Sequence, residues 1–314
     1  MESNSNKIAI LSKRYIDFIF LGSGFSADIY KVRDSTDDKE YALKLFKEDD
    51  SYSENEIKIN KEISKSNNPS FTKYITSSVD NFTIEESNSL KSFMILELAS
   101  KGSVMDYLMK DEKGLEEKFC KLFFSKLLII VKDLHTMGIC HRDLKLDNFL
   151  FDENFNIKLS DFGFSSFIKK NKNGKKKMKT EYVGTLSYMA PEIVMKIPYD
   201  GEKADIFSLG IILFNLRTCH FGFINASFND SLYRFIQGKK IKTYWKLLGQ
   251  NIEINYLSEE FKNLYSKMIS FNPKERPTIE EIYNDEWLRE IRDLNEQELM
   301  DLEQELINEL KRRE

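Results

Sequence analysis

The sequence predicts an α+β fold in which a sheet-rich first lobe is followed by a larger and mainly helical second lobe. Two observations carry this prediction. β-branched and aromatic runs separated by turn residues dominate the first hundred residues, and apolar residues recur at steps of three and four after Ser103. Hydrophobic residues make up 41% of the 314 residues and charged residues 31%, so the composition is that of an ordinary globular protein.

The first lobe is expected to contain short strands and one helix. The expected strands cover residues 14–22, 27–33, 41–46 and 93–98. One helix is expected over residues 54–65, because Ile57, Ile59 and Ile63 form a helical stripe there. The Asn67-Asn68-Pro69 segment should end this helix, and residues 99–103 should form a connector to the second lobe.

The second lobe is expected to consist mainly of helices. Apolar residues repeat at helical spacing between Phe119 and Leu134, which predicts one long helix. Further helices are expected at residues 204–218, 228–237, 259–270 and 278–283. Two short strands are expected at residues 148–151 and 157–159, because each run is brief, apolar and flanked by Asp and Asn.

Charge and cysteine content restrict the classes of function. The 47 basic and 51 acidic residues give a formal net charge of −4, so no general attraction to nucleic acid is expected. No apolar run reaches the roughly 18 residues of a membrane span, and no secretion signal is recognisable. The cysteines and histidines lack the spacing of disulfide frameworks or metal sites. A soluble protein in a reducing compartment, the cytoplasm, is therefore expected.

A glycine-rich turn precedes a lysine on the next expected strand. The turn and its flanks comprise Leu21, Gly22, Ser23, Gly24, Phe25, Ser26, Ala27, Asp28 and Ile29. Glycines without side chains let backbone N–H groups approach phosphate oxygens, although a two-glycine turn is also a common structural feature. Strand alternation after Ala42 should place Lys44 beneath the turn. The two features together favour phosphate binding.

Three further motifs follow in order. They are His141-Arg142-Asp143-Leu144-Lys145-Leu146-Asp147-Asn148, Asp161-Phe162-Gly163 and Ala190-Pro191-Glu192. Their order and spacing resemble those of the eukaryotic protein kinase family, over roughly residues 14–290. The resemblance implies a bilobal protein kinase fold, with a small N-terminal antiparallel sheet and one main helix before a larger helical C-terminal lobe. Acidic and amide residues are common in loops, but their joint occurrence with Lys44 favours catalysis.

The resemblance also implies ATP and Mg²⁺ as cofactors, protein hydroxyls as substrates and a role for each matched residue. Asp143 would accept or orient the proton of the substrate hydroxyl, while Asn148 and Asp161 would hold Mg²⁺. Lys44 would bind the α and β phosphates and pair with a glutamate, for which Glu56 is the first choice and Glu54 and Glu62 stay open. The residues expected to contact adenine are Ile29, Ala42, Leu96, Glu97 and Ala99.

The substrate class rests on Lys145 and Thr185, which resemble the serine/threonine form of the family. Two segments, residues 178–185 and 272–278, resemble the calcium/calmodulin-dependent and calcium-dependent kinases, although no EF-hand follows. The resemblance further implies a buried Glu192–Arg276 ion pair and a structural role for Asp205.

The main alternative to an active protein kinase is a pseudokinase scaffold that binds nucleotide or partners, and it predicts the loss of an essential group. A metabolic small-molecule kinase is a third interpretation.

The predicted domain boundaries divide the chain into three parts. They are an N-terminal extension (1–13), a kinase domain (14–290, with N-lobe 14–98, hinge 97–102 and C-lobe 103–290) and an acidic helical tail (291–314). In the tail, Leu299, Leu302, Leu306 and Leu310 form a stripe, and Asn295 to Glu298 resembles a capping box. This helix should dock on its own domain or self-associate, with pseudosubstrate-like inhibition as an alternative.

Two features bear on regulation. Glu181 occupies a position where many relatives carry an activating phosphothreonine, and its carboxylate should pair with Arg142 and order the loop without phosphorylation. Thr180 and Tyr182 stay open as phosphorylation sites. The run Lys169–Lys179 contains seven lysines, and a mobile solvated loop is the favoured interpretation. Recruitment of acidic partners, anionic lipid or a nuclear import receptor is the alternative.

Overall fold

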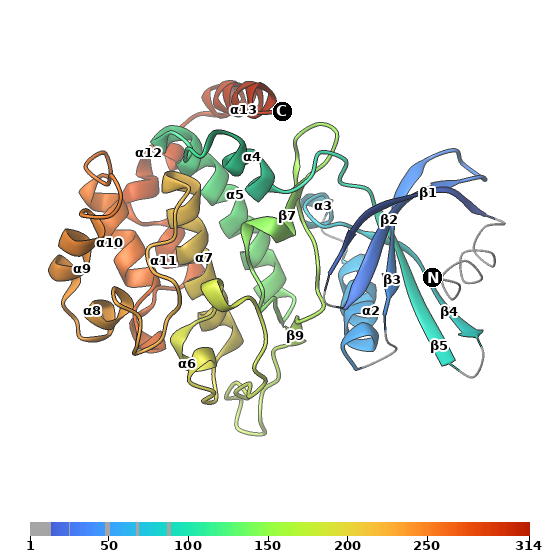
Figure 1. Cartoon of the computed structure of the whole chain (residues 1–314), viewed down its shortest axis with the longest axis horizontal. Coiled ribbons are helices and arrows are strands. Elements are labelled where there is room, and N and C mark those ends of the chain that lie inside the picture. The colour runs from blue at the N-terminus through green and yellow to red at the C-terminus, as the bar shows by residue number, and fades with distance from the viewer. Residues whose placement is uncertain (1–13, 25, 48–50, 67–68, 87–88) are drawn as a thin grey trace. The chain divides into compact units, whose positions relative to one another are not determined.

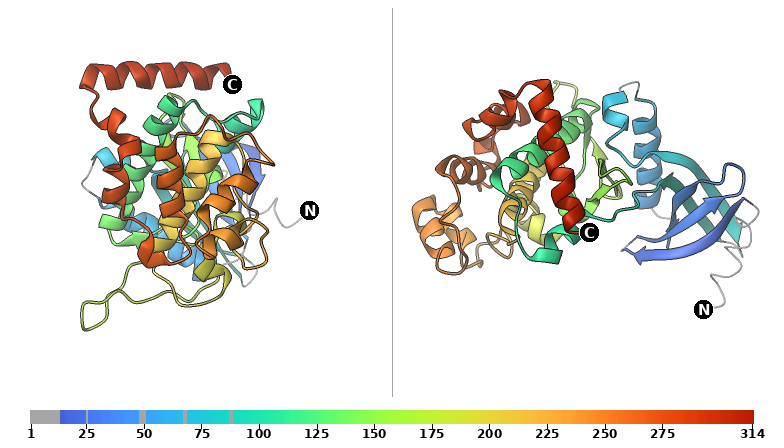
Figure 2. Two further views of the ribbon diagram at one scale, coloured as in Figure 1. Left: turned by 90° about the vertical axis from the view of Figure 1, so that its left-hand side faces the viewer. Right: turned by 90° about the horizontal axis from the view of Figure 1, so that it is seen from above.

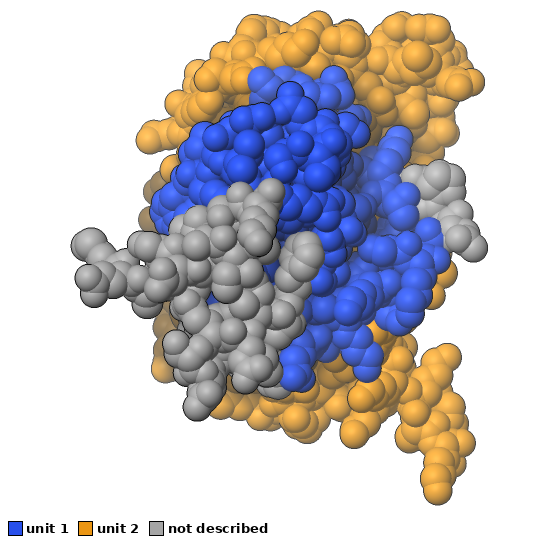
Figure 3. All heavy atoms as spheres, turned by 90° about the vertical axis from the view of Figure 1, so that its right-hand side faces the viewer, with its two compact units in different colours: residues 1–102, 150–165 blue, residues 103–149, 166–314 orange. Residues whose placement is uncertain are grey.

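The computed structural model describes residues 14–24, 26–47, 51–66, 69–86 and 89–314. The chain divides into two compact units, which Figure 3 distinguishes by colour. Unit 1 comprises residues 1–102 and 150–165, and unit 2 comprises residues 103–149 and 166–314. The segment 150–165, which the predicted boundaries assign to the C-lobe, therefore clusters with unit 1. The predicted extension, lobes and tail stay predictions.

Unit 1 contains a five-stranded antiparallel sheet with strand order β1-β2-β3-β5-β4 (Figure 1). The strands are β1 (Tyr15–Ser23), β2 (Ala27–Asp34), β3 (Glu40–Phe46), β4 (Ser78–Glu86) and β5 (Ser89–Glu97). The sequence analysis missed β4. This strand lies at the edge of the sheet, where pairing on one side suffices and a continuous apolar run is not required.

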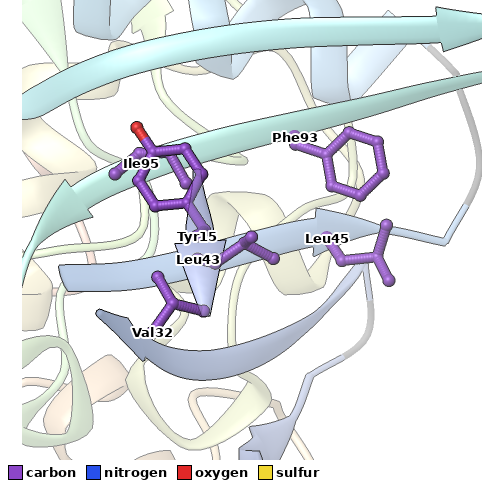
Figure 4. Packing of buried hydrophobic residues seen from close by; sticks show 6 residues of the cluster. All are labelled: Tyr15, Val32, Leu43, Leu45, Phe93 and Ile95. Atoms are coloured by element: carbon purple, nitrogen blue, oxygen red, sulfur yellow. The ribbon is translucent and has the colours of Figure 1, made fainter. Parts of the chain in front are cut away.

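The two faces of this sheet carry different residues, because side chains alternate along each strand. One face packs a hydrophobic cluster formed by Tyr15, Val32, Leu43, Leu45, Phe93 and Ile95 (Figure 4). The strand register places Lys44 opposite both Ile29 and Met94, and Ala42 opposite Leu96, on the other face. The packed face thus supports the sheet, and the other face carries the residues expected to bind nucleotide.

Helix α2 (Ser51–Ser64) supplies the main helix of unit 1, with Ile59 and Ile63 buried, and the short α3 (Pro69–Thr72) follows. The expected stop at Asn67-Asn68 lies outside the described residues. Strands β7 (Phe149–Phe151) and β8 (Ile157–Leu159) pair with each other. The backbone N–H of Thr76 donates to the carbonyl of Leu159, which ties the 150–165 segment to the rest of unit 1.

Unit 2 is built mainly of helices, so the predicted fold class is confirmed. Its helices are α4 (Val104–Asp111), α5 (Glu117–Thr136), α6 (Pro191–Val194), α7 (Gly201–Thr218), α8 (Tyr233–Gln237), α9 (Ile241–Leu248), α10 (Glu259–Met268), α11 (Ile279–Tyr283), α12 (Arg289–Arg292) and α13 (Glu296–Arg312). Two-residue strands β6 (Ile139–Cys140) and β9 (Ser166–Phe167) pair beside them. Helix α7 is buried on nearly every side and forms the centre of the unit.

One helix prediction was too long, and several helices were not predicted. Residues 228–232 are not helical, because the Asp230 carboxylate accepts hydrogen bonds from the backbone N–H groups of Ile224, Leu232 and Tyr233 and holds a loop there. Helix α8 therefore begins at Tyr233. Helices α3, α4, α6 and α9 were not predicted. Among the described residues, no helix is both long and apolar enough to span a membrane.

The predicted Glu192–Arg276 ion pair is present inside unit 2. Both guanidinium Nη atoms of Arg276 donate to Glu192, at 2.7 and 2.6 Å, and both side chains are buried. Arg276 also donates to the carbonyls of Ser270 and Lys203. The charge is thus fully hydrogen-bonded, which offsets the cost of its burial.

Helix α13 lies along the outside of unit 2, against α5 (Figure 2). The predicted capping box at its start is present, with Asn295 and Glu298 bonded to each other's backbone N–H groups. Leu306 and Leu310 are buried. Around them, Lys118 pairs with Glu305 at 2.5 Å and Lys126 with Glu303 at 2.9 Å.

Candidate functional site

Unit 1 brings Lys44, Glu56 and Asp161 together. The Nζ of Lys44, on β3, lies 2.6 Å from Oε1 of Glu56 on α2 and 2.9 Å from Oδ1 of Asp161. Lys44 and Glu56 are buried, whereas the Asp161 side chain is 44% exposed. Of the other two glutamates considered, Glu54 is exposed and Glu62 pairs with Lys65. The lysine thus contacts one carboxylate that is enclosed and one that faces outward.

The charge state of Lys44 follows from its two partners. Burial by itself would lower the pKa of the Lys44 ammonium, but the carboxylates of Glu56 and Asp161 outweigh burial and raise it. Lys44 is therefore a permanent cation at physiological pH. A fixed positive charge in a buried position attracts phosphate oxygens more strongly than one in water does.

The Asp161-Phe162-Gly163 segment has a backbone suited to its place beside this ion pair. Asp161 adopts a left-handed conformation with φ of 60°, which aspartate tolerates better than most residues. A side chain at Gly163 would place its Cβ 3.3 Å from Oε2 of Glu56 and 3.4 Å from Oδ1 of Asp161. Glycine at position 163 therefore lets the segment pass closely beside both carboxylates.

Packing does not require glycine in the turn between β1 and β2. A Cβ at Gly22 would meet no atom within 4 Å, and neither Gly22 nor Gly24 has a positive φ. A purely structural turn would not need glycine at either position, which favours the phosphate-binding interpretation. Lys47 donates to Oγ of Ser23 and to the carbonyl of Gly24, so it fastens the turn. Phe25 lies outside the described residues.

The residues expected to contact adenine lie on or just after the strands of this sheet. Ile29, Ala42 and Leu96 share the face that carries Lys44, and Ala99 follows β5 in the connector. The Glu97 carboxylate lies 2.6 Å from Nζ of Lys158 on β8, and its N–H donates to the carbonyl of Ser77. The Glu97–Lys158 pair was not anticipated from the sequence, because its two members are 61 positions apart in the printed sequence.

In unit 2, a second group of polar side chains lies around Asp143. Oδ2 of Asp143 lies 3.1 Å from Nζ of Lys145, and that ammonium donates to Oγ1 of Thr185 at 2.9 Å. The Asn148 amide nitrogen donates to the Asp143 carbonyl at 2.8 Å. Oδ1 of Asp143 is buried and has no hydrogen-bond partner among the described residues. Leaving a buried carboxylate oxygen unbonded is costly, so this atom is a strong acceptor for an incoming hydroxyl.

Asp205 holds the backbone of the same loop. Its two carboxylate oxygens accept from the N–H groups of His141 at 2.8 Å and Arg142 at 2.7 Å, and Nε2 of His135 lies 2.8 Å from Oδ2. Arg142 has a left-handed backbone with φ of 66°, which costs energy unless the surroundings enforce it. Asp205, on α7, thus positions the segment that carries Asp143.

The segment before Thr185 is attached to this loop through Arg142. The guanidinium of Arg142 donates to Oε2 of Glu181 at 3.1 Å and to the hydroxyl of Tyr199 at 3.3 Å. Partial burial opposes ionisation of Glu181, but hydrogen bonds from its own N–H and that of Thr180, together with Arg142, lower the pKa of this carboxyl. Thr180 and Tyr182 are both exposed.

Comparison with known proteins identifies the family that these features define. The family model of the protein kinase domain matches residues 15–288, so the chain belongs to the protein kinase family. Several of its relatives are named as serine/threonine kinases. The human "SNF-related serine/threonine-protein kinase" is 36% identical over 200 residues, which cover 63% of this chain and 24% of that protein.

Two other relatives align over more of the chain. The Dictyostelium discoideum "Probable serine/threonine-protein kinase MARK-B" is 31% identical over 272 residues, which cover 85% of this chain and 35% of that protein. "CBL-interacting protein kinase 11" of Oryza sativa subsp. japonica is 31% identical over 296 residues, which cover 91% and 54% respectively. The chain thus spans between about a quarter and about half of the length of these curated relatives.

The side chains fit the cofactors that the family uses in general, ATP and Mg²⁺. Carboxylate and amide oxygens, as in Asp161 and Asn148, are ligands that Mg²⁺ prefers. Within the described ranges, no three His, Cys, Asp or Glu side chains form a metal cluster. The orphaned Oδ1 of Asp143 is suited to a hydroxyl rather than to a phosphate anion.

Proposed function

We propose that this chain is a catalytically active serine/threonine kinase, which transfers the γ-phosphoryl group of MgATP to Ser and Thr hydroxyls of proteins. The observation that carries the proposal is the contact of the buried Lys44 ammonium with both Glu56 and Asp161. A hydrophobic residue would stabilise the fold better than a buried lysine with two carboxylates. A structural role therefore does not explain why lysine occupies this position. The contacts of Asp143 with Lys145, and of Lys145 with Thr185, in unit 2 also support the proposal.

Each residue has a role that follows from its charge and surroundings. Lys44 binds the α and β phosphates, and Glu56 orients its ammonium. The residues from Leu21 to Asp28 enclose the phosphates through their backbone, while Ile29, Ala42, Leu96, Glu97 and Ala99 contact the adenine. Asn148 and Asp161 hold Mg²⁺, which when bound neutralises phosphate charge and so lowers the barrier to attack.

Asp143 orients the substrate hydroxyl and accepts its proton at the orphaned Oδ1. Lys145 and Thr185 position the Asp143 carboxylate through the contacts at 3.1 and 2.9 Å. The Lys145 ammonium also offers a positive charge to the transferred phosphoryl group.

The alternative, a pseudokinase scaffold, has less support. It requires the loss of at least one essential group, but Lys44, Asp143, Asn148 and Asp161 are all present. Ala27 replaces a third glycine of the turn, and its side chain is buried in a small apolar cluster with Phe46 and Met94. Alanine at this position therefore has a packing role that is compatible with an intact turn.

Two further proposals concern the kinase group to which the chain belongs and the compartment in which it acts. We place the chain near the calcium/calmodulin-dependent group, because residues 178–185 and 272–278 resemble the corresponding segments of that group. We also propose action in the cytoplasm. Cys120, Cys140 and Cys219 are all free thiols, and burial raises the pKa of the Cys140 thiol to about 12. Such cysteines suit a reducing compartment.

The test uses purified chain, MgATP and a casein-type protein substrate. We expect phosphate on Ser and Thr, identified by mass spectrometry, and a fall in kcat of about 10²–10⁴-fold in Asp143→Asn. ATP affinity should stay within about twofold of the original value in this variant, because Asp143 does not bind the nucleotide. The control is Asp293→Asn, which alters an exposed carboxylate. Equal activity of both variants would contradict the proposal.

A further inference from the structure

The lysine-rich segment 169–179, here called the lysine hairpin, folds back on itself. The backbones of Lys170 and Lys176 form an antiparallel bridge, and the N–H of Lys177 donates to the carbonyl of Lys169 at 2.7 Å. The turn is closed by Asn171, whose side chain accepts from Asn173 and Lys175, and by Gly174 with φ of 74°. Backbone and side-chain hydrogen bonds thus give this solvent-exposed run a definite shape.

The seven lysines of the hairpin fall into two sets. Lys176 pairs with Asp200 and Glu202, and Lys179 donates to Oγ of Ser166 and the carbonyl of Phe167. These two anchor the hairpin to unit 2. The other five have no carboxylate partner among the described residues and are exposed: Lys169, Lys170, Lys172, Lys175 and Lys177. No acidic residue occurs within the segment itself. The hairpin therefore carries a concentrated positive charge on a chain whose net charge is −4.

The lysine hairpin is joined directly to the residues around Asp143. Lys179 and Tyr199 form an antiparallel bridge, and the Tyr199 hydroxyl contacts Arg142 beside Asp143. Thr185, six residues after Lys179, accepts the hydrogen bond from Lys145. The hairpin projects from the helices of unit 2 beyond α6 (Figures 1 and 2). Backbone and side-chain contacts thus attach the lysine hairpin to the segments that carry Arg142 and Thr185.

We propose that the lysine hairpin is a docking element for acidic segments of protein substrates, so that this kinase favours Ser and Thr residues that lie near a run of Asp or Glu. The inference rests on the proposed kinase activity and specifies its substrate class. Five unpaired ammonium groups in nine residues bind a flexible polyanion by summing many weak contacts, each of which is small by itself. The gain appears in KM, because the contacts are made equally before and during phosphoryl transfer.

The composition of the hairpin favours an acidic peptide over the other polyanions. Residues 169–179 contain no aromatic residue and no arginine, the side chains that stack on bases of single-stranded nucleic acid. Met178 is their only large apolar residue, so the hairpin lacks the apolar face with which a peripheral helix enters a membrane. Its attachment beside Thr185 connects it to the site where the substrate protein must bind.

Chain geometry limits the distance between the hydroxyl and the acidic run. The eight residues from Lys177 to Thr185 span at most about 27 Å, at about 3.4 Å per extended residue. An extended substrate covers the same distance with about eight residues. The acidic run should therefore begin within about ten residues of the target Ser or Thr, on one side of it.

The experiment compares three Ser-containing peptides with the full chain: one neutral, one with six glutamates on the N-terminal side and one with six on the C-terminal side. We expect one acidic peptide to have a KM about tenfold below that of the neutral peptide, at equal kcat. Raising the salt from about 0.05 to 0.5 M should abolish this difference, because exposed charges are screened. The triple variant K170Q/K172Q/K175Q should lose it too, with unchanged activity on the neutral peptide.

The matched control removes the same charge elsewhere on unit 2. K240Q/K242Q/K246Q alters three exposed lysines on and next to α9, and it should keep the preference for the acidic peptide. Equal KM values for all three peptides, or an equal loss in both triple variants, would overturn the docking role. Thermal melting of each variant checks that the fold is kept.

A binding assay separates this proposal from the kinase assignment. Fluorescence anisotropy of a labelled hexaglutamate peptide without a hydroxyl needs no turnover. Binding that is lost in the hairpin variant and kept in the control supports docking, even if phosphorylation fails. Hairpin-dependent binding to phosphatidylserine vesicles or to single-stranded RNA, with no binding to hexaglutamate, would assign the hairpin to those ligands and overturn the proposal.

Discussion

At the scale of single residues, the chemistry depends on charges that are held in place by their neighbours. Lys44 keeps its proton because two carboxylates outweigh the effect of burial on its pKa. Asp143 keeps one oxygen without a partner among the described residues, because Lys145 and Asn148 contact the rest of the residue. Both arrangements cost folding energy, which is typical of a site prepared for a ligand.

Glu181 shows how one carboxylate can order a loop. Its contact with Arg142 supplies about one negative charge where phosphate would supply about 1.5 to 2. We expect unphosphorylated chain to be active and Glu181→Gln to lower its kcat about tenfold, with casein-type substrate turnover as the measurement. An inert enzyme that becomes active only after phosphorylation of Thr180 would contradict this.

The same residue predicts a pH dependence. Because the pKa of Glu181 is lower in the folded chain than in the unfolded one, its charged form stabilises the fold. This contribution is fully present above the ordinary carboxyl pKa and disappears as the pH falls through the lowered value. The Tm difference between wild type and Glu181→Gln should therefore be constant near neutrality and shrink in acid.

At the scale of elements, the period of the side chains decides which face each element uses. Alternation along β2, β3 and β5 puts one set of residues into the cluster of Figure 4 and leaves Ile29, Ala42, Lys44 and Leu96 on the other face. A shift of register by one residue would bury Lys44 in the apolar cluster. The hydrophobic pattern of the strands thus also positions Lys44, the lysine that we propose to bind nucleotide.

Helix α13 provides the test at this scale. Leu306 and Leu310 are only 4% and 3% exposed, and Leu→Ala at such sites costs about 2–5 kcal/mol. We expect Leu306→Ala to release α13 from α5, with faster amide hydrogen exchange confined to α13 and the surface of α5 beneath it. Met300→Ala, which alters a side chain that is 57% exposed, should leave exchange unchanged.

The oligomeric state distinguishes docking from self-association of this helix. A monomer by light scattering, in which α13 is protected, agrees with docking on its own domain. A dimer that dissociates in Leu306→Ala would mean that the stripe binds a second copy instead.

At the scale of the whole molecule, stability depends on buried charges that are fully paired. The Glu192–Arg276 pair joins α6 to the loop before α11 and is almost inaccessible to solvent. Replacing Arg276 by Leu leaves the Glu192 carboxylate buried and unpaired, which costs about 3–5 kcal/mol. We expect a correspondingly lower urea midpoint for Arg276→Leu. Lys239→Gln, which removes an exposed pair with Glu275, should change it little; equal effects would contradict this reasoning.

Much of the fold was predictable because it follows from local patterns. Strands β1, β2, β3 and β5, the helices α2, α5, α7 and α10 and the capping box of α13 each have a signal within a short window of sequence. Strand β4 was missed because an edge strand needs no continuous apolar run. Helices α3, α4, α6 and α9 were missed because each is short, and α9 also lacks a side-chain cap at its start. Helix α8 was predicted too long because the Asp230 side chain binds nearby backbone N–H groups and holds a loop there, which the apolar spacing does not reveal.

The sequence by itself determined the family, the candidate catalytic residues and most of the longer elements, because motifs and periodicity are properties of neighbouring positions. Only the tertiary structure decided which of three glutamates contacts Lys44, which lysines of residues 169–179 are anchored and which are exposed, and that Lys158 pairs with Glu97. The physical reason is that an ion pair depends on distances of a few ångströms between residues that can be far apart in sequence. Such distances are determined when the chain packs.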